Sequence, residues 1–194
     1  MKSVRFALHA VALLSLASLA SLGLAQSDMR KATDKAPPSD AQKSFDQLKT
    51  LSGTWRGSVK ATPPDPDIDN AKPEITLRVT SRGNALVHEM QEAGVPLDPT
   101  KYDHPVTMLY LEGDRLNLIH YCDAGNRPHM VARPSQNDKT VEFDFQDLSG
   151  GNAYGHMYHA VFTIIDANHH IEDWTYLMPG DKPVQVHMDL QRAK

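Results

Sequence analysis

Short segments in which apolar and polar residues alternate run through most of this chain, and they constrain its fold more than any other feature. In 74–81 the apolar side chains Ile75, Leu77 and Val79 are separated by polar ones, and 141–148 has the same pattern. A period of two residues indicates a β-strand with one buried and one wet face. The pattern therefore predicts a sheet whose strands each cover one side of a hydrophobic interior.

Ten such segments, rich in β-branched and aromatic residues, follow one another after residue 53 and are separated by proline and glycine. Several connections are as short as Gly113-Asp114, and turns of that length join antiparallel neighbours. A meander of this length has two exposed edges unless its first and last strands pair. We therefore predict an all-β fold, an antiparallel up-and-down barrel of about ten strands that encloses a cavity. The expected strands are 54–61, 74–81, 85–92, 106–112, 115–122, 129–133, 141–148, 156–165, 171–178 and 184–191.

One short N-terminal helix is expected before the first strand. Ser39 offers an N-cap oxygen, and Phe45, Leu48 and Leu51 then fall on one helical face. Gly53 ends the pattern. The helix therefore presents an apolar face that can pack against the barrel.

The first 25 residues have the composition of an export signal. Lys2 and Arg5 precede a run of Ala, Leu, Val and Ser without an acidic residue, and the small residues Gly23 and Ala25 fit a signal-peptidase site. The protein is therefore expected to be secreted or periplasmic, with no membrane span after the signal is cleaved. The predicted organisation is a signal peptide at 1–25, a flexible polar linker at 26–42 and a barrel domain at 43–194.

Charge excludes one class of partner. The chain has 20 Lys and Arg residues against 24 Asp and Glu, a formal net charge of −4, whereas a nucleic-acid binder needs a basic face. The single cysteine, Cys122, excludes an intramolecular disulfide and is expected to be buried and inert. These features leave the oligomeric state open.

The start of the domain resembles the opening of lipocalin-like, or calycin, barrels. Residues 45–57 place a short helix before Gly53-x-Trp55 on the first strand. In that family the tryptophan plugs the closed end of the barrel, and a basic residue from the last strand packs over it. The resemblance implies that Gly53, Trp55 and Arg192 form such a plug, with the guanidinium within about 6 Å of the ring. The segment 120–130 is also similar to uncharacterised secreted bacterial barrels of this type.

A second resemblance supplies the main alternative. Nitrobindin-like haem proteins are ten-stranded barrels with a Gly-Thr-Trp-x-Gly start and a haem-ligating histidine on the last strand. The segments 53–57 and 187–192 are similar to those features. This resemblance implies a haem cofactor with His187 as its axial ligand, whereas the calycin resemblance implies no cofactor.

Two histidines in apolar rows are the candidate polar groups of the interior. His88 shares a strand face with Leu86 and Met90, and His120 shares one with Leu118. A buried ring nitrogen needs a hydrogen-bond partner, which is a ligand, a water or a neighbouring side chain. The opposite faces of both strands are also apolar, so a rival assignment turns both histidines outward.

Other histidines are expected to be structural. His156 and His159 lie three apart on a strand and point to opposite faces, so they do not converge on a metal ion. His169 and His170 adjoin a turn and are expected to be solvated. Asp173 interrupts an apolar row and is the candidate inward carboxylate for acid–base chemistry.

The leading hypothesis is a barrel that binds a small, mostly apolar molecule in its interior, oriented by His88 and His120. The chain has no nucleophile elbow, P-loop or dinucleotide fingerprint, which favours binding over catalysis. The alternatives are the haem protein and an envelope interaction module whose barrel is filled. The expected pocket lining is Val79, Leu86, His88, Met108, Tyr110, Leu118, His120, Phe143, Phe145 and Phe162.

Overall fold

The computed structural model describes residues 37–134 and 137–194. The predicted signal peptide and most of the predicted linker lie outside the described residues. The expected helix is present and begins at Asp40, after the predicted N-cap Ser39. No helix in the described ranges is long and apolar enough to cross a membrane. The elements are α1 (Asp40–Lys49), β1 (Gly53–Thr62), α2 (Pro66–Asp69), β2 (Pro73–Thr80), the 3₁₀ turn η1 (Ser81–Gly83), β3 (Ala85–Glu92), β4 (Val106–Glu112), β5 (Arg115–Tyr121), β6 (Arg127–Ala132), β7 (Thr140–Ser149), β8 (His156–Asp166), β9 (His169–Met178) and β10 (Lys182–Arg192).

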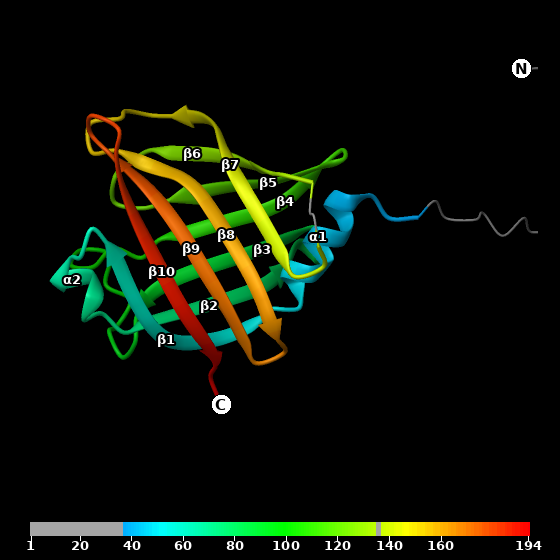
Figure 1. Cartoon of the computed structure of the whole chain (residues 1–194), viewed down its shortest axis with the longest axis horizontal. Coiled ribbons are helices and arrows are strands. Elements are labelled where there is room, and N and C mark those ends of the chain that lie inside the picture. The colour runs from blue at the N-terminus through cyan, green and yellow to red at the C-terminus, as the bar shows by residue number, and fades with distance from the viewer. Residues whose placement is uncertain (1–36, 135–136) are drawn as a thin grey trace, which may run out of the picture. The chain divides into compact units, whose positions relative to one another are not determined.

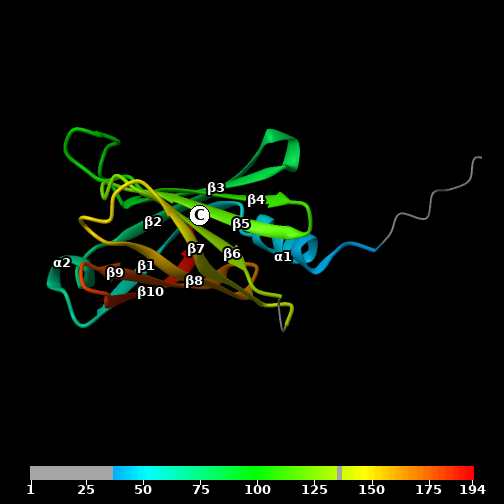
Figure 2. The ribbon, with the colours of Figure 1, turned by 90° about the horizontal axis from the view of Figure 1, so that it is seen from above.

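The ten predicted strands are all present, and consecutive strands pair in an antiparallel arrangement (Figure 1). β1 also pairs with β10, in a register that runs from Trp55 opposite Arg192 to Thr62 opposite Gln185. This pairing closes the sheet into a barrel, as the sequence predicts, and removes the free edges. Figure 2 separates the wall formed by β3, β4 and β5 from the wall formed by β9, β10 and β1.

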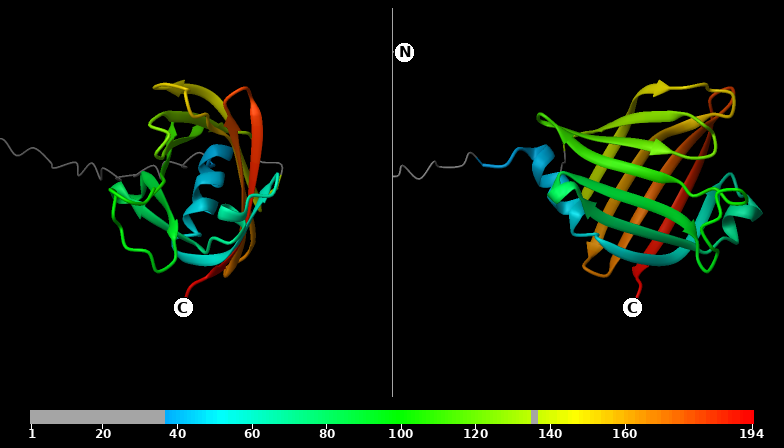
Figure 3. Two further views of the ribbon diagram at one scale, coloured as in Figure 1. Left: turned by 90° about the vertical axis from the view of Figure 1, so that its left-hand side faces the viewer. Right: turned by 180° about the vertical axis from the view of Figure 1, so that it is seen from behind.

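Helix α1 covers one end of the barrel. The Ser39 hydroxyl caps it by accepting a hydrogen bond from the Gln42 amide at 3.2 Å. Phe45 and Leu48 on its inner face are 1% and 0% exposed. Figure 3 (left) looks through the ring of strands to α1 at the far end. Full burial of such a side chain contributes about 1.5–3 kcal/mol, so packing on the barrel stabilises this short helix.

Trp55 and Arg192 form the plug at this end. The Trp55 ring is 0% exposed, and its Nε1 donates a hydrogen bond to the Leu51 carbonyl oxygen at 2.7 Å. The Arg192 guanidinium carbon lies 4.1 Å from the centre of the ring. Its Nη1 also donates to the Ser52 carbonyl oxygen at 2.7 Å. The geometric prediction for this pair is confirmed.

Two glycines of the first strand make these contacts possible. Gly53 has a φ of +136°, and a Cβ there would lie 2.6 Å from Nη1 of Arg192. At Gly57 a Cβ would lie 1.7 Å from the carbonyl oxygen of Asp189 on β10. A side chain at either position would therefore displace the plug or the strand pairing that closes the barrel.

Helix α2 lies at the opposite end of the barrel from α1, in the connection between β1 and β2 (Figure 1). Asp65 caps it by accepting from the Asp67 amide at 2.9 Å. Asp69 holds it against the barrel, because its Oδ1 accepts a hydrogen bond from the Ala61 amide at 2.7 Å. This second helix was not predicted.

The inner face of β4 differs from the predicted one. Thr107 and Leu109 are buried, and Leu109 is opposite Leu86 of β3. Alternation therefore turns Met108 and Tyr110 outward, so their predicted place inside the barrel is wrong. Apolar residues occur on both faces of this strand, and a shift of one residue exchanges the two faces. Val79, at the end of β2, is also misplaced, because it is 38% exposed.

Candidate functional site

A layer of polar side chains crosses the interior of the barrel. His88 of β3, Thr107 of β4 and His120 of β5 lie side by side in the sheet register. From the opposite wall, Glu172 of β9 reaches His88, with 2.9 Å between Oε2 and Nε2. These four residues are at most 1% exposed. The interior therefore contains a buried hydrogen-bonding network as well as an apolar core.

Three ring nitrogens converge on the Glu172 carboxylate. Besides His88, Nε2 of His170 lies 3.0 Å from Oε1, and Nε1 of Trp174 donates to Oε2 at 3.0 Å. Burial opposes ionisation, but attraction to His88 and the hydrogen bonds from both histidines outweigh it. They hold the pKa of Glu172 well below its usual range. Glu172 is therefore a buried carboxylate that carries its charge at neutral pH.

His120 is neutral at that pH. Burial and repulsion from His88 lower the pKa of His120 to about 4. Its Nδ1 lies 2.8 Å from the Thr107 hydroxyl oxygen, and its ring centre lies 5.8 Å from that of Trp174. The inward orientation predicted for His88 and His120 is confirmed, with protein side chains as their partners. Their contact with a ligand stays a prediction.

Two atoms of this network have no partner. Nδ1 of His88 and Nδ1 of His170 are buried without a hydrogen bond from any described residue. The rings are held instead by aromatic contacts: His170 lies edge-on to Trp55, with 4.2 Å between ring centres, and His88 lies 5.7 Å from Trp174. An unsatisfied buried polar atom costs about 1–3 kcal/mol. The network therefore lowers the stability that a purely apolar layer would give.

A pocket of about 480 Å³ opens at the end of the barrel that carries α2. Met90, Met157 and Met188 line it together with the Trp174 ring. Its volume falls within the range of about 300–1,000 Å³ typical of small-molecule sites, and methionine side chains adapt to ligands of different shape. Its other apolar lining residues are Val59, Ile68, Ala71, Pro73, Pro105 and Val186.

Trp174 belongs to both the pocket and the polar network. Its ring lines the pocket, while its Nε1 is bonded to Glu172. Hydrogen bonding of the indole to a buried carboxylate restrains the orientation of the ring. The pocket therefore borders one restrained and almost fully buried indole ring as well as three flexible methionines.

The predicted lining residues do not border this pocket. Leu86, Leu118, Phe143 and Phe162 are 0% exposed and belong to the packed core. Phe145 is partly exposed and stacks on Tyr158, with 5.7 Å between ring centres. One sequence signal could have located the pocket. His88 and Met90 share the inner face of β3, and Met90 lines the pocket.

The inner face of β9 differs from the predicted one. His170, expected to be solvated, is 0% exposed, as is Glu172. Asp173, the predicted inward carboxylate, is half exposed and lies 2.6 Å from Nδ1 of His187. The alternation of His170, Glu172 and Trp174 was the available signal. Because an ionised side chain is rarely buried, this alternation alone does not predict an inward Glu172.

His187 lies on the outer surface of β10. Its side chain is 51% exposed, while its neighbour Met188 faces the interior and is 2% exposed. Alternation along the strand separates the two. His187 therefore offers no ligand atom to the inside of the barrel.

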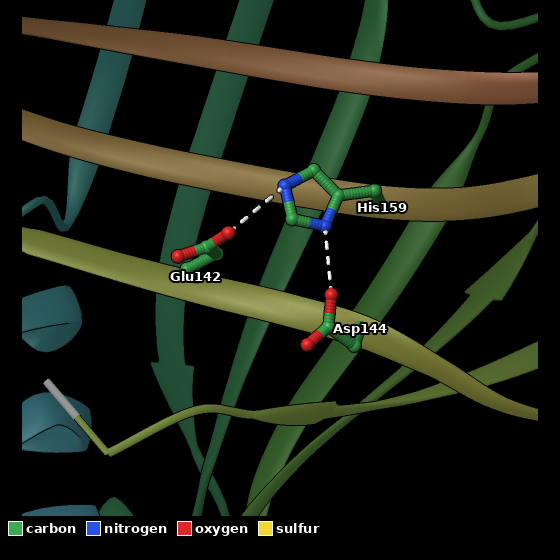
Figure 4. A group of neighbouring side chains, drawn as sticks. All are labelled: Glu142, Asp144 and His159. Carbon is green, nitrogen blue, oxygen red and sulfur yellow. Dashed lines mark hydrogen bonds and ion pairs between the residues drawn. The ribbon is translucent and has the colours of Figure 1, made fainter. Parts of the chain in front are cut away.

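Glu142 and Asp144 of β7 meet His159 of β8 on the outside of the barrel (Figure 4). Asp144 Oδ1 lies 3.1 Å from Nδ1 of His159, and Glu142 Oε1 lies 3.4 Å from its Nε2. Arg133 pairs with both carboxylates, including a contact of 2.7 Å to Glu142. Arg133 therefore already pairs with both carboxylates of this group. His156 bonds instead to Asn152, at 3.0 Å, apart from this cluster.

Cys122 is only partly buried, so the expectation of a fully buried thiol is not met. Burial raises the pKa of the Cys122 thiol. Because the thiolate is the nucleophilic form, this shift disfavours reactivity at neutral pH.

Comparison with known proteins bears on the fold alone. No protein-family model matches the chain, and no curated protein sequence matches it. The crystal structure of Rv2717c from M. tuberculosis is similar over 77% of this chain and 97% of its own, with a TM-score of 0.55 and 12% identity. A protein of unknown function from the DUF3598 family of Nostoc punctiforme PCC 73102 is 11% identical over 75% of this chain and 49% of its own, with a TM-score of 0.47. The first of these comparisons supports a shared barrel fold.

Proposed function

We propose that the protein binds a small, mostly apolar molecule in the pocket at the α2 end of the barrel. The pocket itself carries this proposal, because it combines a volume of about 480 Å³ with a wall of methionine, aliphatic and tryptophan side chains. Burial of roughly 200 Å² of apolar ligand surface supplies about 5 kcal/mol before the costs of ordering. That contribution suits a binding protein of moderate affinity.

The chemistry of the lining favours binding over catalysis. In the part of the chain that the structure describes, no serine, cysteine or histidine lines the pocket, so these residues offer no nucleophile with an adjacent base there. The plug of Trp55 and Arg192 supports a calycin-like barrel, and the leader-like sequence at 1–25 supports an exported, periplasmic or secreted carrier. The haem and filled-barrel alternatives stay predictions.

A fluorescence titration with the neutral apolar dye N-phenyl-1-naphthylamine tests the proposal. We expect the dye to brighten on addition of the full chain, because the pocket excludes water from it. The variant Val186→Trp should abolish this signal. Val186 lies opposite Trp174 in the register and lines the pocket, so a larger ring there fills it.

The matched control is Val131→Trp, which makes the same change on the outer face of β6, beside the buried Met130. It should bind the dye like the unmodified protein. Failure of the unmodified protein to bind the dye, or equal binding by Val186→Trp, would contradict the proposal. A Soret band in protein purified after haem supplementation would support the haem alternative instead.

A further inference from the structure

We infer that the ligand of this pocket carries a positive charge at one end. The inference rests on the proposed function and adds to it the chemical class of the ligand. Three carboxylate side chains, Asp67, Glu92 and Asp103, line the pocket, and among residues 37–134 and 137–194 no lysine, arginine or histidine does. An apolar tail inside the pocket would place a cationic head group among these carboxylates.

The three carboxylates come from three separate segments. Asp67 lies on α2, Glu92 ends β3, and Asp103 lies in the loop that precedes β4. Glu92 continues the inward row of His88 and Met90, so strand alternation directs it to the pocket side of β3. The fold therefore brings negative charge to the pocket from α2, from the barrel wall and from a loop.

Neighbouring acidic residues have structural partners. Asp65 caps α2, Asp69 holds the Ala61 amide, and Glu74 forms an ion pair with Arg56 at 2.5 Å. By contrast, the side chains of Asp67 and Glu92 form no hydrogen bond or ion pair within the described ranges. No described cationic side chain therefore contacts either of these two exposed carboxylates.

Asp103 also forms no ion pair with a described residue. Its Oδ1 accepts a hydrogen bond from the Asp123 amide at 3.1 Å. Burial and the nearby charge of Asp123 raise the pKa of Asp103, so its negative charge is disfavoured in the free protein. A cation placed beside it would relieve this repulsion.

The occupant that fits both features is an amphiphile with a short hydrocarbon body and an ammonium or amidinium head. Carboxylates near the surface each contribute modestly, and salt screens them. Together they should favour a cationic head over an anionic one of similar body by about tenfold in Kd at low salt.

Three probes with the same ten-carbon chain test this inference: decyltrimethylammonium, decanol and decyl sulfate, each below its micelle concentration. The readout is Trp174 fluorescence in the full chain carrying Trp55→Phe, because the sequence has two tryptophans and this change leaves only the one that lines the pocket. Titrations run at low and at high salt. We expect decyltrimethylammonium to bind most tightly and decyl sulfate least, with the difference shrinking at high salt.

The test variant combines Asp67→Asn, Glu92→Gln and Asp103→Asn, and it should bind all three probes with similar affinity. The control combines Glu112→Gln, Asp114→Asn and Asp138→Asn, three exposed positions that do not line the pocket. It changes the net charge equally but should keep the preference for the cation. Circular dichroism confirms that both variants are folded.

The outcomes separate this inference from the proposed function. Equal binding of the three probes, tighter binding of decyl sulfate, or loss of the preference in the control would overturn the inference and leave the apolar pocket intact. Binding of none of the probes would overturn the proposed function as well. Cation preference that depends on the three carboxylates supports both.

Discussion

The two tryptophans of the chain occupy opposite kinds of environment within one barrel. Trp55 and Trp174 are 0% and 1% exposed, and each donates its indole N–H to a protein oxygen. Trp55 is sealed by Arg192 and the apolar face of α1, whereas Trp174 lines an open pocket of about 480 Å³. The barrel thus has one end packed for stability and one end with space for a ligand.

The largest expected effect is a difference in the free energy of unfolding that is lost when a side chain is truncated at one end or at the other. Trp55→Ala should lower the free energy of unfolding by about 3–5 kcal/mol, because it leaves a cavity in packed surroundings. Met90→Ala should cost only about 1 kcal/mol, because Met90 already borders empty space. Urea denaturation followed by circular dichroism measures both. Equal losses would contradict the division of the barrel into a packed and an open end.

A smaller effect is expected from the polar network between the two ends. The pKa of His120 is about 4 when folded, below the value of 6.5 for an unperturbed histidine. The unfolded chain therefore gains this proton first, and stability falls as the pH drops from about 6.5 to about 4. The full difference is about 3 kcal/mol. Glu172 adds to the loss in acid, because its folded pKa is also lowered.

Unfolding curves of His120→Asn over the same pH range isolate this effect. Asparagine can still bond to the Thr107 hydroxyl but does not take up a proton. The variant should therefore lose about 3 kcal/mol less than the unmodified protein between pH 7 and pH 4. His104→Asn, in the loop before β4, controls for loss of a histidine. An unchanged slope in His120→Asn would show that His120 is not a buried neutral group.

The smallest effect concerns the geometry of the plug. Arg192→Lys keeps the positive charge but loses the planar group that donates to the carbonyl oxygens of Ala167, Ser52 and Thr50. We expect a loss of about 1–2 kcal/mol in the free energy of unfolding. Arg56→Lys, in an exposed ion pair, should cost less than about 0.5 kcal/mol. Similar values for both variants would mean that charge alone holds the plug.

The barrel and its plug could be predicted from the sequence, because both depend on patterns of neighbouring residues. Strand alternation and short turns define antiparallel neighbours locally, and closure follows from the need to cover two free edges. Gly53 and Trp55 lie close together in sequence, so a short motif reveals them. Arg192 was predicted from the resemblance to calycin barrels, and the pairing of β1 with β10 places it opposite Trp55.

The site was harder to predict, because its parts depend on strand faces and long-range pairing. Met108 and Tyr110 were assigned inward because β4 is apolar on both faces, so its pattern does not fix the orientation. Glu172 was missed because only its contacts with His88, His170 and Trp174 make burial of the charge possible. His170 and Trp174 lie two residues away, but His88 lies 84 residues away in sequence, so the local alternation alone does not predict that the charge is buried.

The pairing of Trp55 with Arg192 also determines how late in synthesis the barrel can finish folding. The ribosome makes the tryptophan early, but its covering guanidinium appears only after nine further strands have been translated. A nascent chain therefore cannot complete the plug, or the pairing of β1 with β10, until residue 192 has left the ribosome. Contacts between such distant residues slow the final step of folding. Until then the polypeptide remains open, with its future interior accessible to chaperones.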